Sequence, residues 1–391
     1  MVVVSIALFT DAFIYGLVIP LAARSPVAGG DASTVAVSYA AYGFGVLLAT
    51  PIVGRLTDQA GRRLPLLLGF ACLSLATVLF GVADSMPILL LARTVQGFAS
   101  TATWTAGLAL VADAFVRNRT QKMGIALMAS SAGSVLGPVV GGALLEFSGS
   151  TWPFIVGGGL LIVDGVLRTS LVVERPRAGT PALNARGLVR ERDVLAAILV
   201  VLLGAAGWSL VEPLLPEHLA RAGAVGPAVI GLMFTVSTLA NGLSAPWIGA
   251  VAERCGLWPT MLAGLVLLAL ALPLLALPVS IVAITGILML VNVAYGVAMN
   301  PSLSELADAV DRRGISAYGA VYALYNVGYA AGQMGGNLLG GLVATSVSFL
   351  GALVLTSMLL LVSVPLIYFI HLRPLRHAAA ASHPMRERTE A

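Results

Sequence analysis

The chain has 391 residues, of which 58% are hydrophobic and only 10% are charged, and its formal net charge is +4. Soluble globular domains carry about 25% charged residues, so this composition excludes an ordinary soluble protein. The apolar residues form long runs without period-two alternation, which also argues against a membrane β-barrel.

Twelve apolar segments predict an all-α integral membrane protein, because roughly 20 apolar residues cross a bilayer as a helix. The segments are approximately 2–23, 36–56, 64–83, 87–112, 122–146, 151–173, 194–220, 227–252, 258–277, 280–309, 315–343 and 347–371. Six fall in each half, which predicts an N-terminal six-helix bundle over 1–173 and a C-terminal one over 194–371. A linker over 174–193 joins them, and we expect the polar tail over 372–391 to be disordered.

Basic residues mark one side of this predicted membrane protein. The short loops after even-numbered spans, the linker and the tail carry most of them, whereas the opposite loops carry only Arg24 and Arg221. Basic loops stay in the cytoplasm, so we expect the linker and both termini there. The positive net charge then reflects membrane topology, and we expect no nucleic-acid partner.

Three acidic residues lie within predicted spans: Asp11 in the first, Asp164 in the sixth and Glu212 in the seventh. An ionisable residue at such depth is a functional candidate by default. Burial favours the protonated form of a carboxyl, so each is a candidate proton carrier for which an organic cation would compete. The alternative for each is a structural role; for Asp164 it is an ion pair with Arg168, one turn along the helix. Prolines that follow Glu212 predict an unwound segment lining a cavity.

The loop between the second and third spans combines glycines and charges, at Gly54, Asp58, Gly61, Arg62 and Arg63. Glycine permits a tight turn. The charged side chains, together with Asp113 after the fourth span, predict a cytoplasmic network that latches the two bundles. This pattern resembles the signature loop of the major facilitator superfamily. The alternative is a solvated loop that only marks orientation.

The fourth span contains Arg93, with Gln96, Gly97 and Ser100 on the same helical face. An arginine in hydrocarbon is costly, so it must face a polar cavity or a partner. The segment resembles the span-four motif of proton-coupled facilitators, in which such an arginine assists proton movement. The alternative is a structural arginine that reaches toward the membrane surface.

The fifth span contains a stripe of small residues, Gly133, Gly137 and Gly141, with Pro138 directly after the second glycine. Glycines four apart allow two helices to pack closely. The stripe resembles the motif that marks the antiporters of the same superfamily. Generic helix packing is the alternative, and it is also the physical role of the motif in antiporters.

Aromatic and amide side chains gather on the tenth and eleventh spans. Tyrosine faces can hold an ammonium group by cation–π attraction, although packing within the bundle explains any single tyrosine equally well. With two residues of the first bundle, they form a predicted substrate cavity of Tyr42, Gln96, Asn292, Asn300, Tyr322, Asn326 and Tyr329.

The two halves repeat each other at a constant offset of 195 residues. Pro51 and Gly54 fall on Pro246 and Gly249, and the glycine stripe of the fifth span falls on that of the eleventh. The chain is therefore two copies of one membrane unit. Duplicated membrane bundles place their ligand site between the copies.

Several segments resemble the vesicular amine transporter-like branch of the drug:proton antiporters. Leu8–Asp11 and Leu210–Pro216 resemble its first and seventh spans, which places Asp11 and Glu212 on essential acids of that family. The chain departs from the family at two of the predicted cavity residues. Tyr42 stands at or near the position of the family's second-span lysine, and Asn326 stands at the position of its eleventh-span acid. The resemblance implies a major facilitator fold and a proton-coupled transporter.

We expect a proton-driven antiporter that exports small cationic or amphiphilic organic molecules across the plasma or inner membrane by alternating access. Asp11, Glu212, Arg93 and Asp164 would couple protons to substrate. The partners are then protons, the substrate and the lipid bilayer, and a monomer suffices. We expect no metal, cofactor or enzymatic activity, because the sequence contains no metal-ligand cluster, phosphate-binding loop or nucleophile–histidine pair. The alternatives are a proton-independent facilitator of a neutral metabolite and a non-transporting membrane receptor.

Overall fold

The computed structural model describes residues 1–22, 32–114, 119–172, 191–221, 225–277, 280–312 and 318–381. Every regular element within these ranges is a helix. The predicted all-α fold is therefore confirmed.

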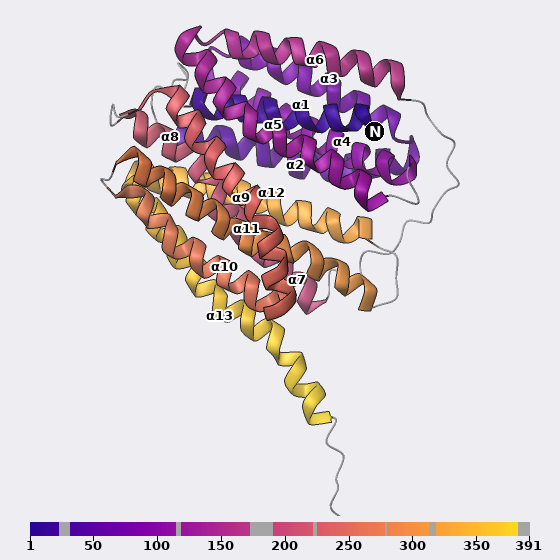
Figure 1. Ribbon diagram of the computed structural model, residues 1–391, viewed down its shortest axis with the longest axis vertical. Coiled ribbons are helices and arrows are strands. Elements are labelled where there is room, and N and C mark those ends of the chain that lie inside the picture. The colour runs from indigo at the N-terminus through magenta and orange to yellow at the C-terminus, as the bar shows by residue number, and fades with distance from the viewer. Residues whose placement is uncertain are drawn as a thin grey trace, which may run out of the picture.

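The first six helices form one bundle, drawn from indigo to magenta in Figure 1. Their bounds are α1 Val2–Ala22, α2 Ala32–Gln59, α3 Arg63–Gly81, α4 Met86–Ala114, α5 Arg119–Phe147 and α6 Trp152–Leu171. Each corresponds to one predicted span of the N-terminal half.

The remaining helices form a second bundle beside the first (Figure 1). Their bounds are α7 Arg192–Ser209, α8 Val211–Arg221, α9 Pro227–Cys255, α10 Leu257–Ala271, the 3₁₀ helix η2 Leu272–Ala276, α11 Ile281–Arg312, α12 Tyr318–Ser346 and α13 Phe349–Ala381. Helices α7 and α8 together make the seventh predicted span, and α10 with η2 makes the ninth. The twelve predicted spans are thus present as twelve helical segments.

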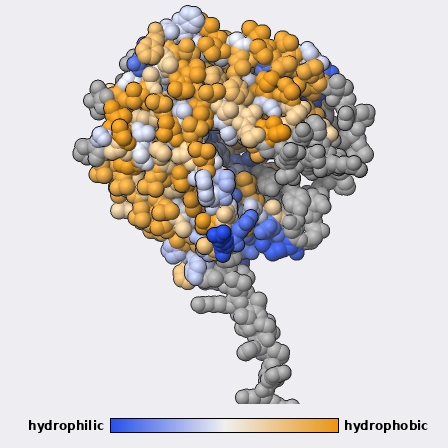
Figure 2. Space-filling view, in the orientation of Figure 1, coloured by the Kyte–Doolittle hydropathy of each residue, from blue (hydrophilic) through white to orange (hydrophobic). Residues whose placement is uncertain are grey.

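Ten of the segments are long and apolar enough to cross a membrane on composition alone, within the described residues. The two that are not, α4 and α12, carry buried polar side chains, such as Arg93 and Gln96 on α4 and Gln333 and Asn337 on α12. Figure 2 shows hydrophobic residues over most of one face, with hydrophilic ones gathered beside a central hollow. The polar residues of α4 and α12 therefore mark the interior and not the lipid-facing surface.

The repeat appears in the packing of α1 on α5 and of α7 on α12. A Cβ added to Gly137 of α5 would lie 2.6 Å from the carbonyl oxygen of Phe13 on α1. In the second bundle, a Cβ on Gly332 of α12 would meet the carbonyl oxygen of Leu202 on α7. Only glycine permits such close backbone contact, so the glycine stripes pack each bundle together.

The two ends of the molecule differ. The basic end carries Arg62, between α2 and α3, and Arg63, the first residue of α3. The opposite end, called the α8 end, carries the last turn of α8. The bundles meet through α2 with α12, α5 with α9, and α8 with α1 and α2. Toward the α8 end, Gly142 of α5 packs against the backbone of Pro227, where α9 begins. Toward the basic end, a Cβ built on Gly54 or Gly249 meets no described atom of another helix within 4 Å. The described contacts therefore close the α8 end (Figure 1).

Two local expectations were wrong. The seventh span is broken at Leu210 but not unwound around Glu212, which lies in the first turn of α8. The break has a simple cause: Pro213 has no N–H to bond the carbonyl of Ser209, four residues earlier. In addition, α13 continues to Ala381, so the first part of the tail is helical where we expected disorder. The Ala-rich sequence explains this, because alanine has the highest helix propensity; residues 382–391 lie outside the described part.

Candidate transport site

Asp11 is buried on α1, where its Oδ2 accepts two hydrogen bonds from α4. Ser100 Oγ donates over 2.7 Å and Trp104 Nε1 donates over 3.1 Å. These donors lie one turn apart on the same face of α4, so a single helix surface holds the carboxylate. Both donors are neutral, and no ion pair within the described residues reaches Asp11.

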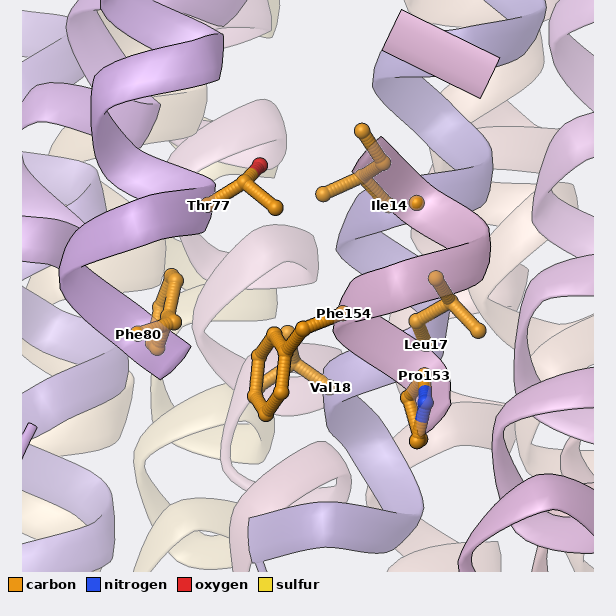
Figure 3. Close-up of a pocket in the computed structure, with 8 residues that line it drawn as sticks. Ile14, Leu17, Val18, Thr77, Phe80, Pro153 and Phe154 are labelled. Atoms are coloured by element: carbon orange, nitrogen blue, oxygen red, sulfur yellow. The ribbon is translucent and has the colours of Figure 1, made fainter. Parts of the chain in front are cut away.

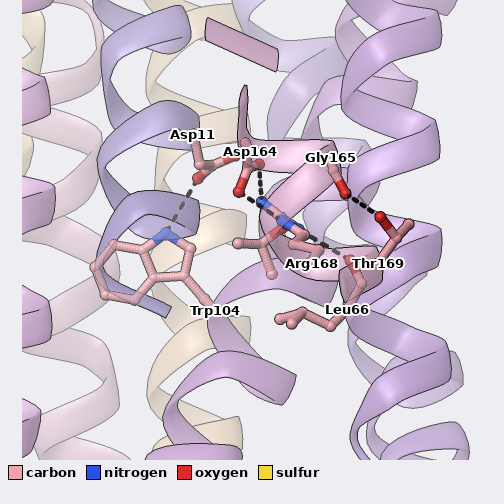
Figure 4. Close-up of polar contacts among 8 residues, drawn as sticks. Asp11, Leu66, Trp104, Asp164, Gly165, Arg168 and Thr169 are labelled. Atoms are coloured by element: carbon pink, nitrogen blue, oxygen red, sulfur yellow. Dashed lines mark hydrogen bonds and ion pairs between the residues drawn. The ribbon is translucent and has the colours of Figure 1, made fainter. Parts of the chain in front are cut away.

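Asp164 is held differently, by a two-point ion pair with Arg168 in which both side chains are fully buried. The guanidinium donates from Nε to Oδ1 over 2.9 Å, and its Nη2 lies 2.6 Å from Oδ2. Arg168 Nη1 also donates to the carbonyl of Leu66, over 2.9 Å, and to Thr103 Oγ1, over 3.2 Å. Figure 4 shows this pair beside Asp11. The geometry supports the structural alternative for Asp164, because its charge is already neutralised.

Arg93 is fully buried on α4 and faces aromatic rings. Its Cζ lies 4.1 Å from the ring centre of Tyr39, 5.2 Å from that of Phe80 and 5.9 Å from that of Tyr15. Arg93 Nη1 donates to Gln96 Oε1 over 3.2 Å. No described carboxylate lies within ion-pair distance, so cation–π contacts stabilise this charge. We expected Arg93 to face a polar cavity or a polar partner. Its surroundings are instead mainly aromatic rings, with Gln96 as a polar partner.

Glu212 is buried at the start of α8 and accepts hydrogen bonds from both bundles. Trp208 Nε1, one turn earlier, donates to Oε1 over 3.0 Å. Tyr15 of α1 donates its hydroxyl to Oε2, and the same hydroxyl accepts a 3.4 Å bond from Gln333 Nε2 of α12. Glu212 therefore lies at the junction of the bundles, and it too has only neutral hydrogen-bond donors among the described residues.

Aromatic rings surround Glu212 on the side of the second bundle. The ring of Trp208 lies 5.8 Å from that of Tyr295 and 6.3 Å from that of Phe234. Tyr325 and Tyr329 of α12 stack at 6.5 Å. Such faces beside a carboxylate suit an organic ammonium group.

The other predicted cavity residues are scattered. Tyr42 is half-buried, with its ring 5.0 Å from that of Tyr15, and Gln96 is buried against Arg93. Asn292 accepts a 2.9 Å bond from Asn241 Nδ2 and donates to Ser237, so its amide is bonded between α9 and α11. Asn300 and Asn326 are exposed. The side chain of Tyr322 lies outside the described residues.

The predicted latch at the basic end is described only in part. Gly61 has φ +82°, a conformation that glycine adopts readily, and it makes the turn between α2 and α3. Arg62 Nη1 donates to the carbonyl of Thr57 over 2.8 Å, and Arg63 begins α3. The side chains of Asp58 and Asp113 lie outside the described residues, so the network around them stays a prediction.

Sequence reasoning missed a charge cluster at the basic end of the second bundle. Arg312 Nη2 lies 2.9 Å from Glu305 Oε1 and 3.6 Å from Asp193 Oδ2, so it ties α11 to α7. It also missed Tyr15 and Trp208. Their spacing is a signal that could have found them, because each lies four residues from a predicted acid, Asp11 and Glu212 respectively.

A small cavity of about 10 Å³ lies inside the first bundle, and none of these carboxylates lines it. Figure 3 shows its walls, which are mainly apolar side chains such as Leu17, Phe80 and Phe154. Its volume accommodates no more than about one water molecule, and it offers almost no polar group to bind one. It is a packing void rather than a substrate site.

Two helical bundles that meet around buried polar residues define a membrane transporter. The family model of the Major Facilitator Superfamily matches residues 1–195 and 197–389, and the chain belongs to this family.

Its curated relatives include vesicular transporters. The chain is 28% identical to the synaptic vesicular amine transporter of Mus musculus over 342 residues, which cover 86% of the chain and 66% of that protein. It is 28% identical to the vesicular acetylcholine transporter of Torpedo marmorata over 356 residues, covering 83% of the chain and 65% of that protein. The chain thus spans slightly less than two thirds of these relatives, and this similarity agrees with the resemblance of its first and seventh spans to the vesicular amine transporter-like branch.

Solved structures share the fold. A bacterial homologue of the human lysosomal transporter Spinster, in an inward-facing and occupied conformation, superimposes with a TM-score of 0.76 at 14% identity, covering 95% of this chain and 96% of that one. The D323A mutant of the nucleoside transporter NupG gives a TM-score of 0.75 at 14% identity, covering 94% and 99%.

Proposed function

We propose that the protein is a proton-coupled antiporter that exports small organic cations or amphiphiles. One contrast supports this: Asp164 is neutralised by Arg168, whereas Asp11 and Glu212 have only hydroxyl and indole donors. A buried carboxylate without an opposite charge is costly, so it gains from binding a proton or a cation. These two ligands exclude each other at one carboxylate, which is the physical requirement for exchange.

The two carboxylates lie in different bundles. Asp11 is held within the first bundle by α4, and Glu212 lies where α8 of the second bundle meets α1. The aromatic rings of Trp208, Tyr295 and Tyr329 near Glu212 favour it as the site of the substrate cation, with Asp11 as the second proton site. Arg93 would bias the charge of Glu212 from across the interface, and Asp164 would hold the fold around Asp11.

The proposal extends to conformation and location. The described contacts close the α8 end, so with the basic end in the cytoplasm this conformation faces inward. The protein would act as a monomer in the plasma or inner membrane, with both termini in the cytoplasm. Exchange of one proton for one monovalent cation is electroneutral. Each further charge moved would add about 2.3 kcal/mol per 100 mV of membrane potential.

Liposomes that contain a pH-sensitive dye test this function. A pH gradient is imposed, and an aromatic monoamine, tetraphenylphosphonium or ethidium is added to wild type, Asp11→Asn and Glu212→Gln. We expect cation-triggered proton movement in wild type and none in either variant. Asp84→Asn, at an exposed carboxylate between α3 and α4, is the matched control and should behave as wild type.

Proton movement that persists unchanged in both variants would refute the role of the carboxylates. Transport of labelled neutral solutes without any pH dependence would instead favour a proton-independent facilitator.

A further inference from the structure

The Tyr15 hydroxyl of the first bundle is hydrogen-bonded to two buried polar side chains of the second. It donates to Glu212 on α8 and accepts from Gln333 on α12. Two helices of the second bundle, α8 and α12, are therefore hydrogen-bonded to one side chain of the first. Because Tyr15 also lies one turn from Asp11 on α1, one helical turn connects the two carboxylates of the proposed exchange.

We propose that Tyr15 is a positioning residue that makes closure of the α8 end depend on the charge of Glu212. The inference rests on the proposed antiport, in which Glu212 alternates between ionised, protonated and cation-bound forms. An O–H donor bonds an ionised carboxylate about twice as strongly as a neutral one. Ionised Glu212 therefore holds the bundles together through Tyr15, and neutralised Glu212 releases them.

This arrangement gives a physical reason for exchange. An antiporter must not change conformation when it carries neither ligand, since that step would dissipate the gradient. The empty form is the one in which Glu212 is ionised and its bond to Tyr15 is strongest. A proton or a substrate cation weakens that bond, so both loaded forms can open the α8 end while the empty form stays closed.

Other groups face Glu212 from both bundles, and none of those in the described part of the chain repeats this contact. Arg93 of α4 and Tyr39 of α2 act on it electrostatically from the first bundle, and Tyr295 and Tyr329 act from α11 and α12. Trp208 bonds the other carboxylate oxygen, but it belongs to the same bundle as Glu212. Its bond therefore does not change when the bundles part.

Ala36 on α2 offers a reporter of closure. It is fully buried, in one apolar cluster with Leu214 and Leu215 of α8, so it becomes accessible when the α8 end opens. The experiment uses full-length protein in detergent with Cys72→Ser, Cys255→Ser and Ala36→Cys. The labelling rate with a hydrophilic maleimide is measured between pH 6 and pH 8. The reference is the labelling rate of the exposed native Cys255, measured separately in protein that keeps this cysteine. Dividing by it removes the pH dependence of the reagent.

We expect normalised labelling to be about fivefold faster at low pH than at high pH, the difference between a charged and a neutral acceptor. Tyr15→Phe keeps the ring, removes the hydroxyl and should label quickly at both pH values. Glu212→Gln, which cannot ionise, should do the same. Tyr368→Phe, at an exposed tyrosine of α13 away from this junction, is the control and should resemble wild type.

Slow, pH-dependent labelling in Tyr15→Phe would overturn the proposal, and so would pH-dependent labelling in Glu212→Gln, because another group would then carry the effect. Gln333→Leu provides a second variant if Tyr15→Phe does not fold. It removes the other bond to the hydroxyl and should shift labelling in the same direction, whereas labelling like wild type would count against the proposal.

The assay contains no substrate, so its outcome is independent of the proposed function. The expected labelling pattern in a protein that fails to exchange protons for cations would leave the junction standing and remove the antiport. If wild type exchanges protons for cations and Tyr15→Phe does not change labelling, the antiport stands and the role of Tyr15 is refuted.

Discussion

Asp11 and Glu212 are bound alike in the two bundles: each buried carboxylate accepts a hydrogen bond from an indole N–H, of Trp104 and Trp208 respectively. Each also accepts a hydrogen bond from one hydroxyl, that of Ser100 for Asp11 and that of Tyr15 for Glu212. The donors differ in origin, because α4 supplies both to Asp11, whereas Glu212 draws one from its own bundle and one from the other. The two carboxylates thus have the same kinds of hydrogen-bond donor, but of these four hydrogen bonds only the one from Tyr15 to Glu212 joins the two bundles.

The Asp164–Arg168 pair should be structural. Arg168→Met leaves Asp164 charged and unpaired in a buried position, and we expect a loss of about 3–5 kcal/mol of stability. The double variant Asp164→Leu, Arg168→Met removes both charges and should recover most of it, measured as thermal unfolding in detergent.

The same double variant decides between the two roles of Asp164. If the pair is only structural, the folded double variant should still exchange protons for cations. A folded double variant that transports substrate without moving protons would restore Asp164 as a coupling residue.

Gly137 should tolerate no side chain. Its Cβ would lie 2.6 Å from the carbonyl oxygen of Phe13, which belongs to the backbone of α1 and cannot move easily. We expect Gly137→Ala to lower stability by about 1–3 kcal/mol through overpacking. Gly158→Ala on α6 is the matched control, because its Cβ meets nothing within 4 Å. It should be neutral or gain up to about 1 kcal/mol of helix propensity; equal melting temperatures for the two variants would contradict the packing account.

Thr235 should help to hold the bundles together. Its Oγ1, on α9, donates to the carbonyl of Val135 on α5 over 2.7 Å. Thr235→Val removes about 1 kcal/mol of cross-bundle hydrogen bonding, so the ratio of closed to open forms should fall about fivefold. Thr238→Val is the control, because Thr238 bonds Phe234 within its own helix. Accessibility of a cysteine at position 36 measures the change, and an equal response of both variants would argue against a role for Thr235 in closure.

Glu146 should act at an exposed contact between the bundles at the α8 end. Its Oε2 accepts a 3.0 Å bond from the backbone N–H of Ala228, in the first turn of α9. A carboxylate is favourable there because the N-terminus of a helix carries partial positive charge. Glu146→Gln should therefore speed labelling at position 36, and Glu146→Asp should do so as well, because it is too short to reach. Raised salt should weaken the wild-type contact in the same direction.

The fold could be predicted almost completely from the sequence, because hydropathy and the repeat depend on local composition. The twelve spans and the use of the α5 glycines for close helix packing follow from such patterns, whereas the partner helix, α1, does not. The pairing of Asp164 with Arg168 was also within reach, since residues four apart on a helix are neighbours.

The site could be predicted less well, because its contacts join distant parts of the chain. Tyr15 and Glu212 are 197 residues apart, and nothing local to either shows that they meet. Arg93 looked like a residue of a polar cavity, yet three aromatic rings around it come from three different helices. Asn292 looked like a cavity residue, but Asn241 and Ser237 satisfy its amide within the second bundle.

The most direct test of the central claim measures proton release when a cation binds to the purified protein. Weakly buffered protein in detergent is titrated with an organic cation that liposome transport shows to be a substrate, at a pH where transport is half-maximal, and the released protons are recorded with a pH dye. Competition at the carboxylates predicts proton release by wild type, and less or none by Asp11→Asn and Glu212→Gln. Cation binding of equal affinity in wild type and both variants, without proton release, would contradict the account.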